Sequence, residues 1–253
     1  MEPVKVRNVE IGAGIPKICV PIVGTTGEEI LDAAEDIAGT AADIVEWRAD
    51  WYEDIFRFDS TRETLAYLRS VLGEIPLLFT FRTAGEGGAR AVEADEYVEL
   101  NRKICGTGMV DLIDVEAFTG DEAVEKVIST AHEKGVRVIG SNHDFQKTPG
   151  KDEILFRLRR IQEMGADIPK IAVMPHSKKD VLTLLAATEE MYREYADRPF
   201  ITMSMAGDGV ISRLGGEVFG SAVTFGAYGK ASAPGQLEVE KLSQVLRIIH
   251  EGM

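Results

Sequence analysis

Lys170 interrupts an apolar run, Ile168–Met174, that is too short for an ordinary helix. Pro169 lies near its start and Pro175 directly follows it. Lysine is almost never fully buried unless it is paired. Burial disfavours the ammonium form, so a buried lysine tends to become a neutral amine that can attack a carbonyl carbon. The position of Lys170 therefore points to Schiff-base catalysis.

A second lysine in a similar setting leaves this interpretation open. Ile15–Val20 has nearly the same pattern around Lys17. One site rarely needs two such lysines, so at least one of the pair is structural. Lys170 itself follows a proline and could begin a strand with its ammonium in water. The pattern alone decides neither lysine.

Histidine, the usual general base near neutral pH, ends or follows two predicted strands. His143 closes one of these strands, and His176 follows the next one after Pro175. His132 and His250 have the surroundings of solvated side chains. Placement at a strand end favours His143 over His176 only modestly, so both remain candidates.

Charged residues end two further strands. Period-two alternation places Glu46 and Arg48 on one side of a strand, where they could pair as a structural salt bridge or bind a substrate. Arg82 and Glu86 form a second charge pair beside a glycine-rich loop. This loop lacks the lysine and spacing of a P-loop and the spaced glycines of a dinucleotide fold. Nucleotide chemistry is therefore disfavoured.

Candidate anion-binding residues follow the last two predicted strands. Arg213 could hold a carboxylate through two parallel hydrogen bonds, with Ser232 and Gln236 as neutral donors. A helix-capping arginine is the alternative for Arg213. Met203 and Met205 fall on one side of a strand, which is more typical of core filling than of function.

The elements that must position these residues alternate along the chain, and this alternation predicts parallel strands joined by helices. Strands are expected at Lys17–Ile22, Asp43–Arg48, Pro76–Arg82, Val110–Glu116, Val136–His143, Pro169–Met174, Phe200–Met205 and Ala222–Phe225. Helices are expected at Glu28–Ala38, Thr61–Leu72, Ala94–Cys105, Asp121–Lys134, Lys151–Met164, Lys178–Tyr195, Val210–Leu214 and Leu237–His250.

This order predicts an α/β fold, a (β/α)8 TIM barrel, with its chemistry at the C-terminal ends of the strands. A doubly wound open sheet is the alternative. Alternating Val4, Val6, Val9 and Ile11 predict a short N-terminal hairpin that covers the barrel floor. No linker or low-complexity tract divides the chain, so residues 1–253 are expected to form one domain.

Composition limits the partners. The chain has 28 basic and 42 acidic residues, a formal charge of −14, which argues against nucleic acid or an anionic membrane as a partner. An anionic substrate would need locally concentrated arginines. Cys19 and Cys105 provide neither a disulfide framework nor metal-ligand spacing. With no signal peptide and no run of about 18 apolar residues, we expect a cytoplasmic protein that does not span a membrane.

The motifs together resemble type I 3-dehydroquinate dehydratase, the Schiff-base dehydratase of the shikimate pathway. The similarity runs from Lys17 to Gln236. Matching so many independent segments in order is far more specific than any one motif. These segments are Glu46–Arg48, Phe79–Arg82, Glu86–Gly88, Asp111–Glu116, Ser141–Phe145, Pro169–Ala172, Ser204–Met205, Ser212–Arg213 and Ser232–Gln236.

The resemblance implies roles that the residues alone left open. Lys170, not Lys17, would form the Schiff base, and His143, not His176, would be the acid/base. Glu86 would orient His143. It also implies a homodimer that acts on a small anion, 3-dehydroquinate.

The resemblance further implies the substrate contacts. Three residues would hold the substrate carboxylate, three would receive the ring hydroxyls, and four would pack around the ring. These are, in turn, Arg213, Ser232 and Gln236; Glu46, Arg48 and Arg82; and Met203, Met205, Phe145 and Phe225.

The chemistry fits these residue types. A protonated imine on Lys170 would be the electron sink that lets His143 remove the α proton and a β hydroxyl leave as water. The expected product is 3-dehydroshikimate, and no cofactor or metal is needed. Two other functions remain open: a lysine-dependent class I aldolase on the same barrel, and a non-catalytic anion-binding barrel.

Overall fold

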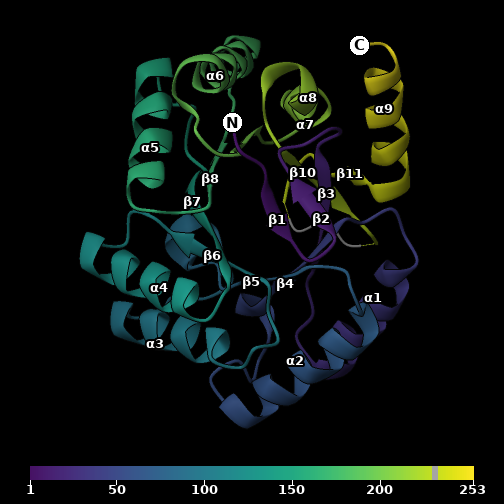
Figure 1. Ribbon diagram of the computed structural model, residues 1–253, viewed down its shortest axis with the longest axis vertical. Coiled ribbons are helices and arrows are strands. Elements are labelled where there is room, and N and C mark those ends of the chain that lie inside the picture. The colour runs from purple at the N-terminus through teal and green to yellow at the C-terminus, as the bar shows by residue number, and fades with distance from the viewer. Residues whose placement is uncertain (230–232) are drawn as a thin grey trace.

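Parallel strands form the centre of the molecule, and helices surround them (Figure 1). The computed structural model describes residues 1–229 and 233–253. Eight strands follow one another around the sheet: β3 (Lys17–Ile22), β4 (Ile44–Arg48), β5 (Leu77–Thr80), β6 (Leu112–Glu116), β7 (Arg137–Asp144), β8 (Ile168–Val173), β9 (Ile201–Ser204) and β10 (Val223–Ala227).

The sheet curls until its two ends meet. Strands β3 to β9 pair in chain order, and β10 pairs with β3. One parallel bridge joins Phe200, just before β9, to Ser221, just before β10. A short strand, β11 (Leu237–Glu238), adds to β10. The predicted barrel is therefore confirmed, although its closure between β9 and β10 rests on few backbone contacts.

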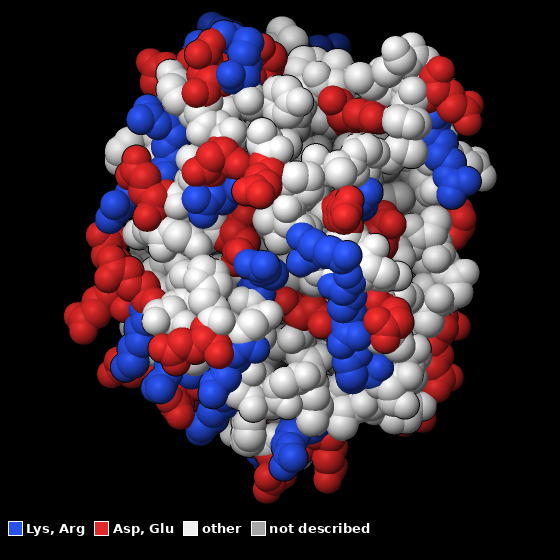
Figure 2. Space-filling view, viewed as in Figure 1, with Lys and Arg blue, Asp and Glu red and all other residues white. Residues whose placement is uncertain are grey.

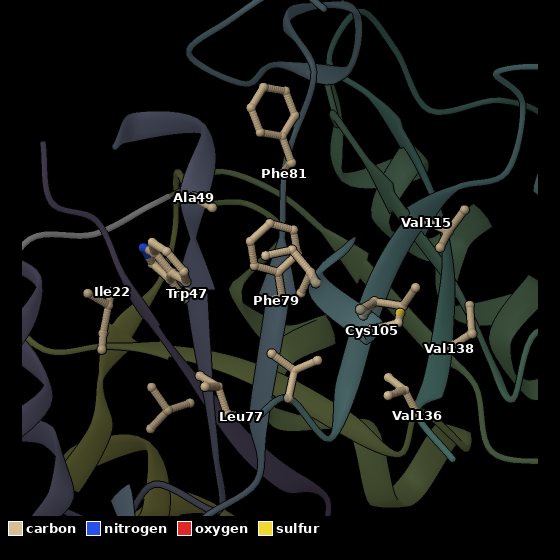
Figure 3. Close-up of a cluster of buried hydrophobic side chains, with 14 of the residues drawn as sticks. Ile22, Trp47, Ala49, Leu77, Phe79, Phe81, Cys105, Val115, Val136 and Val138 are labelled. Atoms are coloured by element: carbon tan, nitrogen blue, oxygen red, sulfur yellow. The ribbon is translucent and has the colours of Figure 1, made fainter. Parts of the chain in front are cut away.

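The helices pack their apolar faces against the outside of the strands. Figure 3 shows part of this layer, where Trp47 and Phe79 meet edge to face with ring centroids 5.6 Å apart. The helices are α1 (Gly27–Ala38), α2 (Phe58–Leu72), α3 (Ala94–Cys105), α4 (Asp121–Glu133), α5 (Lys151–Glu163), α6 (Lys178–Glu190), α7 (Val210–Leu214), α8 (Gly216–Phe219) and α9 (Val239–Glu251), with single turns η1 (Ala49–Trp51), η2 (Ala84–Glu86) and η3 (Met191–Tyr195).

The predicted N-terminal hairpin is present and covers the barrel floor. Strands β1 (Val4–Val6) and β2 (Val9–Ile11) pair in antiparallel fashion. Val6 and Ile11 pack in one apolar cluster with residues from the N-terminal halves of the barrel strands, among them Ile44. The hairpin therefore closes one end of the barrel, and the opposite end is left for the site.

Several predicted boundaries differ from the structure. The expected helix Lys178–Tyr195 ends at Glu190, and a wider π-helical turn, η3, follows it. The expected strand Pro76–Arg82 ends at Thr80, because the backbone N–H of Arg82 donates to Asp50 instead of to a neighbouring strand. The sequence did not predict α8 and β11, which are too short to have a detectable period.

Charges of both signs are interspersed on the face of the molecule viewed in Figure 2. Several charges of the molecule are paired, for example Arg137 with Asp167 and Arg160 with Asp121. None of the helices described between residues 1 and 253 is both long enough and apolar enough to cross a membrane.

Candidate active site

A cavity of about 220 Å³ lies at the C-terminal ends of the barrel strands. It is below the roughly 300–1,000 Å³ typical of sites for drug-sized ligands, so it suits one small molecule. Every predicted site residue within the described ranges lines it, whereas Ser232 lies outside those ranges. The lining residues are Glu46, Arg48, Arg82, Glu86, Gly87, His143, Phe145, Lys170, Ala172, Met203, Met205, Arg213, Phe225, Ala233, Pro234 and Gln236.

Side chains alternate between the two faces of β8, and that of Lys170 lies on the face that points into the barrel. Lys170 and Ala172 line the cavity, whereas Ile171 packs outward in the layer beneath α5 and α6. Only 3% of Lys170 is exposed. Its Nζ lies 3.1 Å from Oδ2 of Asp114 and 4.5 Å from the ring centroid of Phe225. Lys170 is thus a buried amine held by a carboxylate and an aromatic face.

Lys17 has a different setting despite its similar sequence. It is the first residue of β3, at the floor end of the barrel. Its Nζ donates to the backbone carbonyls of Ala13 and Ile15, at 3.0 and 3.2 Å. Lys17 does not line this cavity, so of the two lysines only Lys170 lies beside the other predicted site residues.

His143 lines the cavity with its imidazole held by Glu86. Nδ1 of His143 lies 2.8 Å from Oε2 of Glu86, and the backbone N–H of His143 donates to the same oxygen at 3.0 Å. Nε2 is therefore the ring nitrogen left for a ligand. His176, the competing candidate, is exposed and has its Nε2 2.6 Å from the backbone carbonyl of Gln146. It does not line the cavity.

The surroundings shift the pKa values of this pair. Burial, with the nearby cations Arg82 and Lys170, lowers the pKa of His143 well below its usual value. Burial also raises the pKa of Glu86 to about 7, although Arg82 opposes the shift. At neutral pH the imidazole is therefore uncharged and can accept a proton.

Arg82 joins the acidic groups of neighbouring strands. Its guanidinium lies 2.7 Å from Asp114, 3.0 Å from Glu116 and 3.5 Å from Glu86. The predicted charge pair of Arg82 and Glu86 is thus present within a larger cluster. Burial raises the pKa of Asp114, but Arg82 and Lys170 outweigh it and lower this pKa well below its usual range. Asp114 therefore remains a carboxylate between two cations.

Arg48 has a partner that the sequence interpretation did not identify. Its Nε and one terminal nitrogen donate to the two oxygens of Asp50, both at 2.8 Å. Glu46 instead accepts from the hydroxyl of Thr80 at 2.8 Å. The expected side of the strand is confirmed, because Glu46 and Arg48 both line the cavity. The suggested pairing between them is wrong, because Asp50 offers the guanidinium a bidentate geometry.

Arg213 is almost completely buried, with 1% exposed. One terminal nitrogen donates to the carbonyl of Pro234 at 3.1 Å, and another lies 3.7 Å from Sδ of Met203. Nε has no hydrogen-bond partner within residues 1–229 and 233–253. Burial lowers the pKa of Arg213 to about 10, so it stays charged at neutral pH. Among the described residues Arg213 has no carboxylate partner, unlike the other cations that line the cavity.

Four residues that hold the site were not assigned roles from the sequence: Asp50, Asp114, Glu116 and Ser141. Glu116 accepts from both the backbone N–H and the hydroxyl of Thr83, and Ser141 donates to Asp114 at 2.5 Å. Asp114 and Glu116 are two residues apart on β6, so both side chains lie on the inward face. Alternation along this strand could have identified them from the sequence.

Within the described part of the chain, no three histidine, cysteine or acidic side chains are arranged to hold a metal ion.

Known proteins resemble the chain in sequence. The sequence model of the type I 3-dehydroquinase family matches residues 18–253. The chain is 54% identical over 250 residues to 3-dehydroquinate dehydratase of Clostridioides difficile, covering 99% of this chain and 98% of that protein. It is 53% identical over 251 residues to 3-dehydroquinate dehydratase of Listeria monocytogenes, covering 99% of each.

Solved structures agree. Type I 3-dehydroquinate dehydratase from Clostridium difficile, crystallised with covalently modified comenic acid, matches with a TM-score of 0.98 and 54% identity over 100% of both chains. The 3-dehydroquinate dehydratase from Geobacillus kaustophilus matches with a TM-score of 0.96 and 42% identity, covering 99% of this chain and 97% of that one. The chain therefore belongs to the type I 3-dehydroquinate dehydratase family, as its motifs predicted.

Proposed function

We propose that this chain dehydrates 3-dehydroquinate to 3-dehydroshikimate through a Schiff base on Lys170. The observation that carries the proposal is the cavity that joins three groups: a buried lysine, an uncharged imidazole on His143, and the cation of Arg213. Membership of the dehydratase family supports the overall reaction. The arrangement of the three groups supports the covalent route.

Imine formation begins when the ketone carbon of the substrate meets Nζ of Lys170. Nζ must first release its ammonium proton, and the neutral amine then adds to the carbonyl. The released proton returns to the carbinolamine oxygen, which leaves as water and gives a protonated imine. This iminium has the same single positive charge as the lysine ammonium. Asp114, 3.1 Å from Nζ, would therefore neutralise the nitrogen both before and after the covalent bond forms. The charge balance of the buried cluster is then preserved through the reaction.

Proton transfer falls to His143. Glu86 contacts Nδ1, so Nε2 is the nitrogen that would take the α proton and give the enamine. The electron pair of the enamine then expels the β hydroxyl, and the imidazolium returns its proton to that oxygen, so that water leaves. Hydrolysis of the conjugated imine releases the product and restores Lys170.

Substrate binding would use the charge that the protein leaves unbalanced. Arg213 would take the substrate carboxylate as its missing anionic partner, with Gln236 and Ser232 as neutral donors. The polar groups Glu46, Arg48 and Arg82 would receive the ring hydroxyls. The ring itself would pack against Met203, Met205, Phe145 and Phe225, which all line the cavity.

Reductive trapping tests the covalent step. Borohydride added with 3-dehydroquinate should attach the substrate carbon skeleton irreversibly to the peptide that contains Lys170, detected as a stable mass increase by peptide mass spectrometry. Lys170→Ala should abolish both labelling and turnover, whereas Lys17→Ala should keep both. Labelling on Lys17 in the wild type would contradict the assignment.

Removal of the base should separate adduct formation from dehydration. His143→Ala should keep some trappable adduct, because Lys170 remains, but should lose turnover by at least about 10²–10⁴-fold, the usual contribution of general acid–base catalysis. His176→Ala, changed outside the cavity, should keep most activity. The base is wrongly assigned if His176→Ala is inactive while His143→Ala is near normal.

Arg213→Ala should raise KM for 3-dehydroquinate by roughly 10–100-fold, because a hydrogen bond to a charged group contributes about 1.5–3 kcal/mol. Arg213→Lys should restore binding only partly, since an ammonium lacks the planar fork of guanidinium. Steady-state kinetics measure both effects. An unchanged KM in both variants would remove Arg213 from the site.

A further inference from the structure

A chain of hydrogen bonds reaches the candidate base from outside the cavity, starting at helix α5. Arg157 donates from one terminal nitrogen to Oδ1 of Asn142 at 3.0 Å. Nδ2 of Asn142 donates to Oε1 of Glu86 at 3.0 Å. The other oxygen of Glu86, Oε2, lies 2.8 Å from Nδ1 of His143. Neither Arg157 nor Asn142 lines the cavity.

Arg157 fixes the direction of this chain. A guanidinium has only donors, so the amide oxygen of Asn142 must face Arg157. The amide nitrogen must then face Glu86, whose Oε1 has to accept. Arg157 is itself held by Glu153, one helical turn away, at 2.7 Å. Its side chain is 22% exposed, and Asp144 lies 3.8 Å from it. The orientation of the amide is therefore set before any ligand binds.

Two proton arrangements are open to the pair of Glu86 and His143. In the first, Glu86 is a carboxylate, Nδ1 carries the proton and Nε2 is free to accept one. In the second, Glu86 is protonated and donates to Nδ1, so that Nε2 carries the proton and cannot act as a base. An N–H aimed at Oε1 stabilises the carboxylate and so favours the first arrangement.

We propose that Asn142 is a positioning residue, oriented by Arg157, that keeps the shared proton on Nδ1 of His143 and leaves Nε2 free as the base. The consequence for catalysis rests on the proposed function, in which His143 takes the α proton. The consequence for the tautomer does not, because it concerns the protein without substrate.

The charges around Glu86 show why such a residue is needed. Burial and the neighbouring carboxylates Glu116 and Asp114 raise the pKa of Glu86, and Arg82 and the N–H of Asn142 lower it. The resulting pKa of about 7 leaves the carboxylate only partly populated at neutral pH. Loss of the Asn142 N–H removes a contact that lowers the pKa of Glu86, so this pKa rises. As the pH falls, the variant should therefore lose the base-competent form at a higher pH than wild type does.

The experiment compares Asn142→Ala, Arg157→Met and the double variant with wild type. Asn142→Ala should lower kcat/KM near pH 7 on the order of tenfold, and activity should recover as the pH rises above the new pKa of Glu86. Arg157→Met lets the amide of Asn142 rotate. It should move the acid limb of the profile of kcat/KM against pH to higher pH, by less than Asn142→Ala does. The double variant should be no worse than Asn142→Ala, because Arg157 acts only through the amide.

Arg160→Met is the matched control. Arg160 lies on the same helix and pairs with Asp121 at 2.7 Å, away from the chain of hydrogen bonds. It should keep the wild-type pH profile. An equal loss of activity at every pH in Asn142→Ala, or additive losses in the double variant, would overturn the proposal in favour of a merely structural role.

Imidazole ¹⁵N NMR of the substrate-free protein gives an independent readout, with the His143 signals identified by their absence from His143→Ala. At about pH 8, above the pKa of Glu86, wild type should have the proton mainly on Nδ1 and a bare Nε2. At the same pH both Asn142→Ala and Arg157→Met should move population toward Nε2–H. A proton mainly on Nε2 in wild type at that pH would refute the proposal. If wild type fails to dehydrate 3-dehydroquinate, the proposed function fails, but this spectrum still decides the role of Asn142.

Discussion

The ion pair of Lys170 with Asp114 is the interaction on which the rest of the site depends. A single charge inside a barrel is very costly, and removing one partner of a buried pair leaves the other uncompensated. Here Arg82, which follows β5, bridges Asp114 and Glu116 of β6, and Asp114 also contacts Lys170 of β8. Asp114 therefore gives the buried Lys170 a carboxylate partner that a second cation, Arg82, also holds.

Arg213 is the exception among the cations that line the cavity. The other cations lining the cavity have carboxylate partners among the described residues, whereas Arg213 has only neutral neighbours. A buried guanidinium in that state attracts an anion strongly, since the surrounding dielectric is low. An anionic substrate would complete the charge balance, although the chain as a whole carries a formal charge of −14.

The sequence predicted the barrel and most of the residues that line the cavity. Both follow from short-range patterns in the sequence: the order of strands and helices, and the alternation of side chains along each strand. Alternation along the strand placed Glu46 and Arg48 on the correct face. It could not identify Asp50 as the partner of Arg48, because a period of two tells which face a side chain lies on but not which residue it contacts. Lys17 and Lys170 have the same flanking pattern and differ only in depth along their strands, which requires the register of the sheet. The resemblance to a known family supplied that choice.

The central claim is that the ketone oxygen leaves as water when Lys170 forms the imine. One turnover of 3-dehydroquinate in H₂¹⁸O, with the product analysed at once by mass spectrometry, measures this directly. The Schiff-base route predicts one ¹⁸O in the ketone group of 3-dehydroshikimate, beyond the slow exchange seen with Lys170→Ala. A product formed by the wild-type protein that keeps the original ketone oxygen would contradict the covalent mechanism, even if dehydration itself were confirmed.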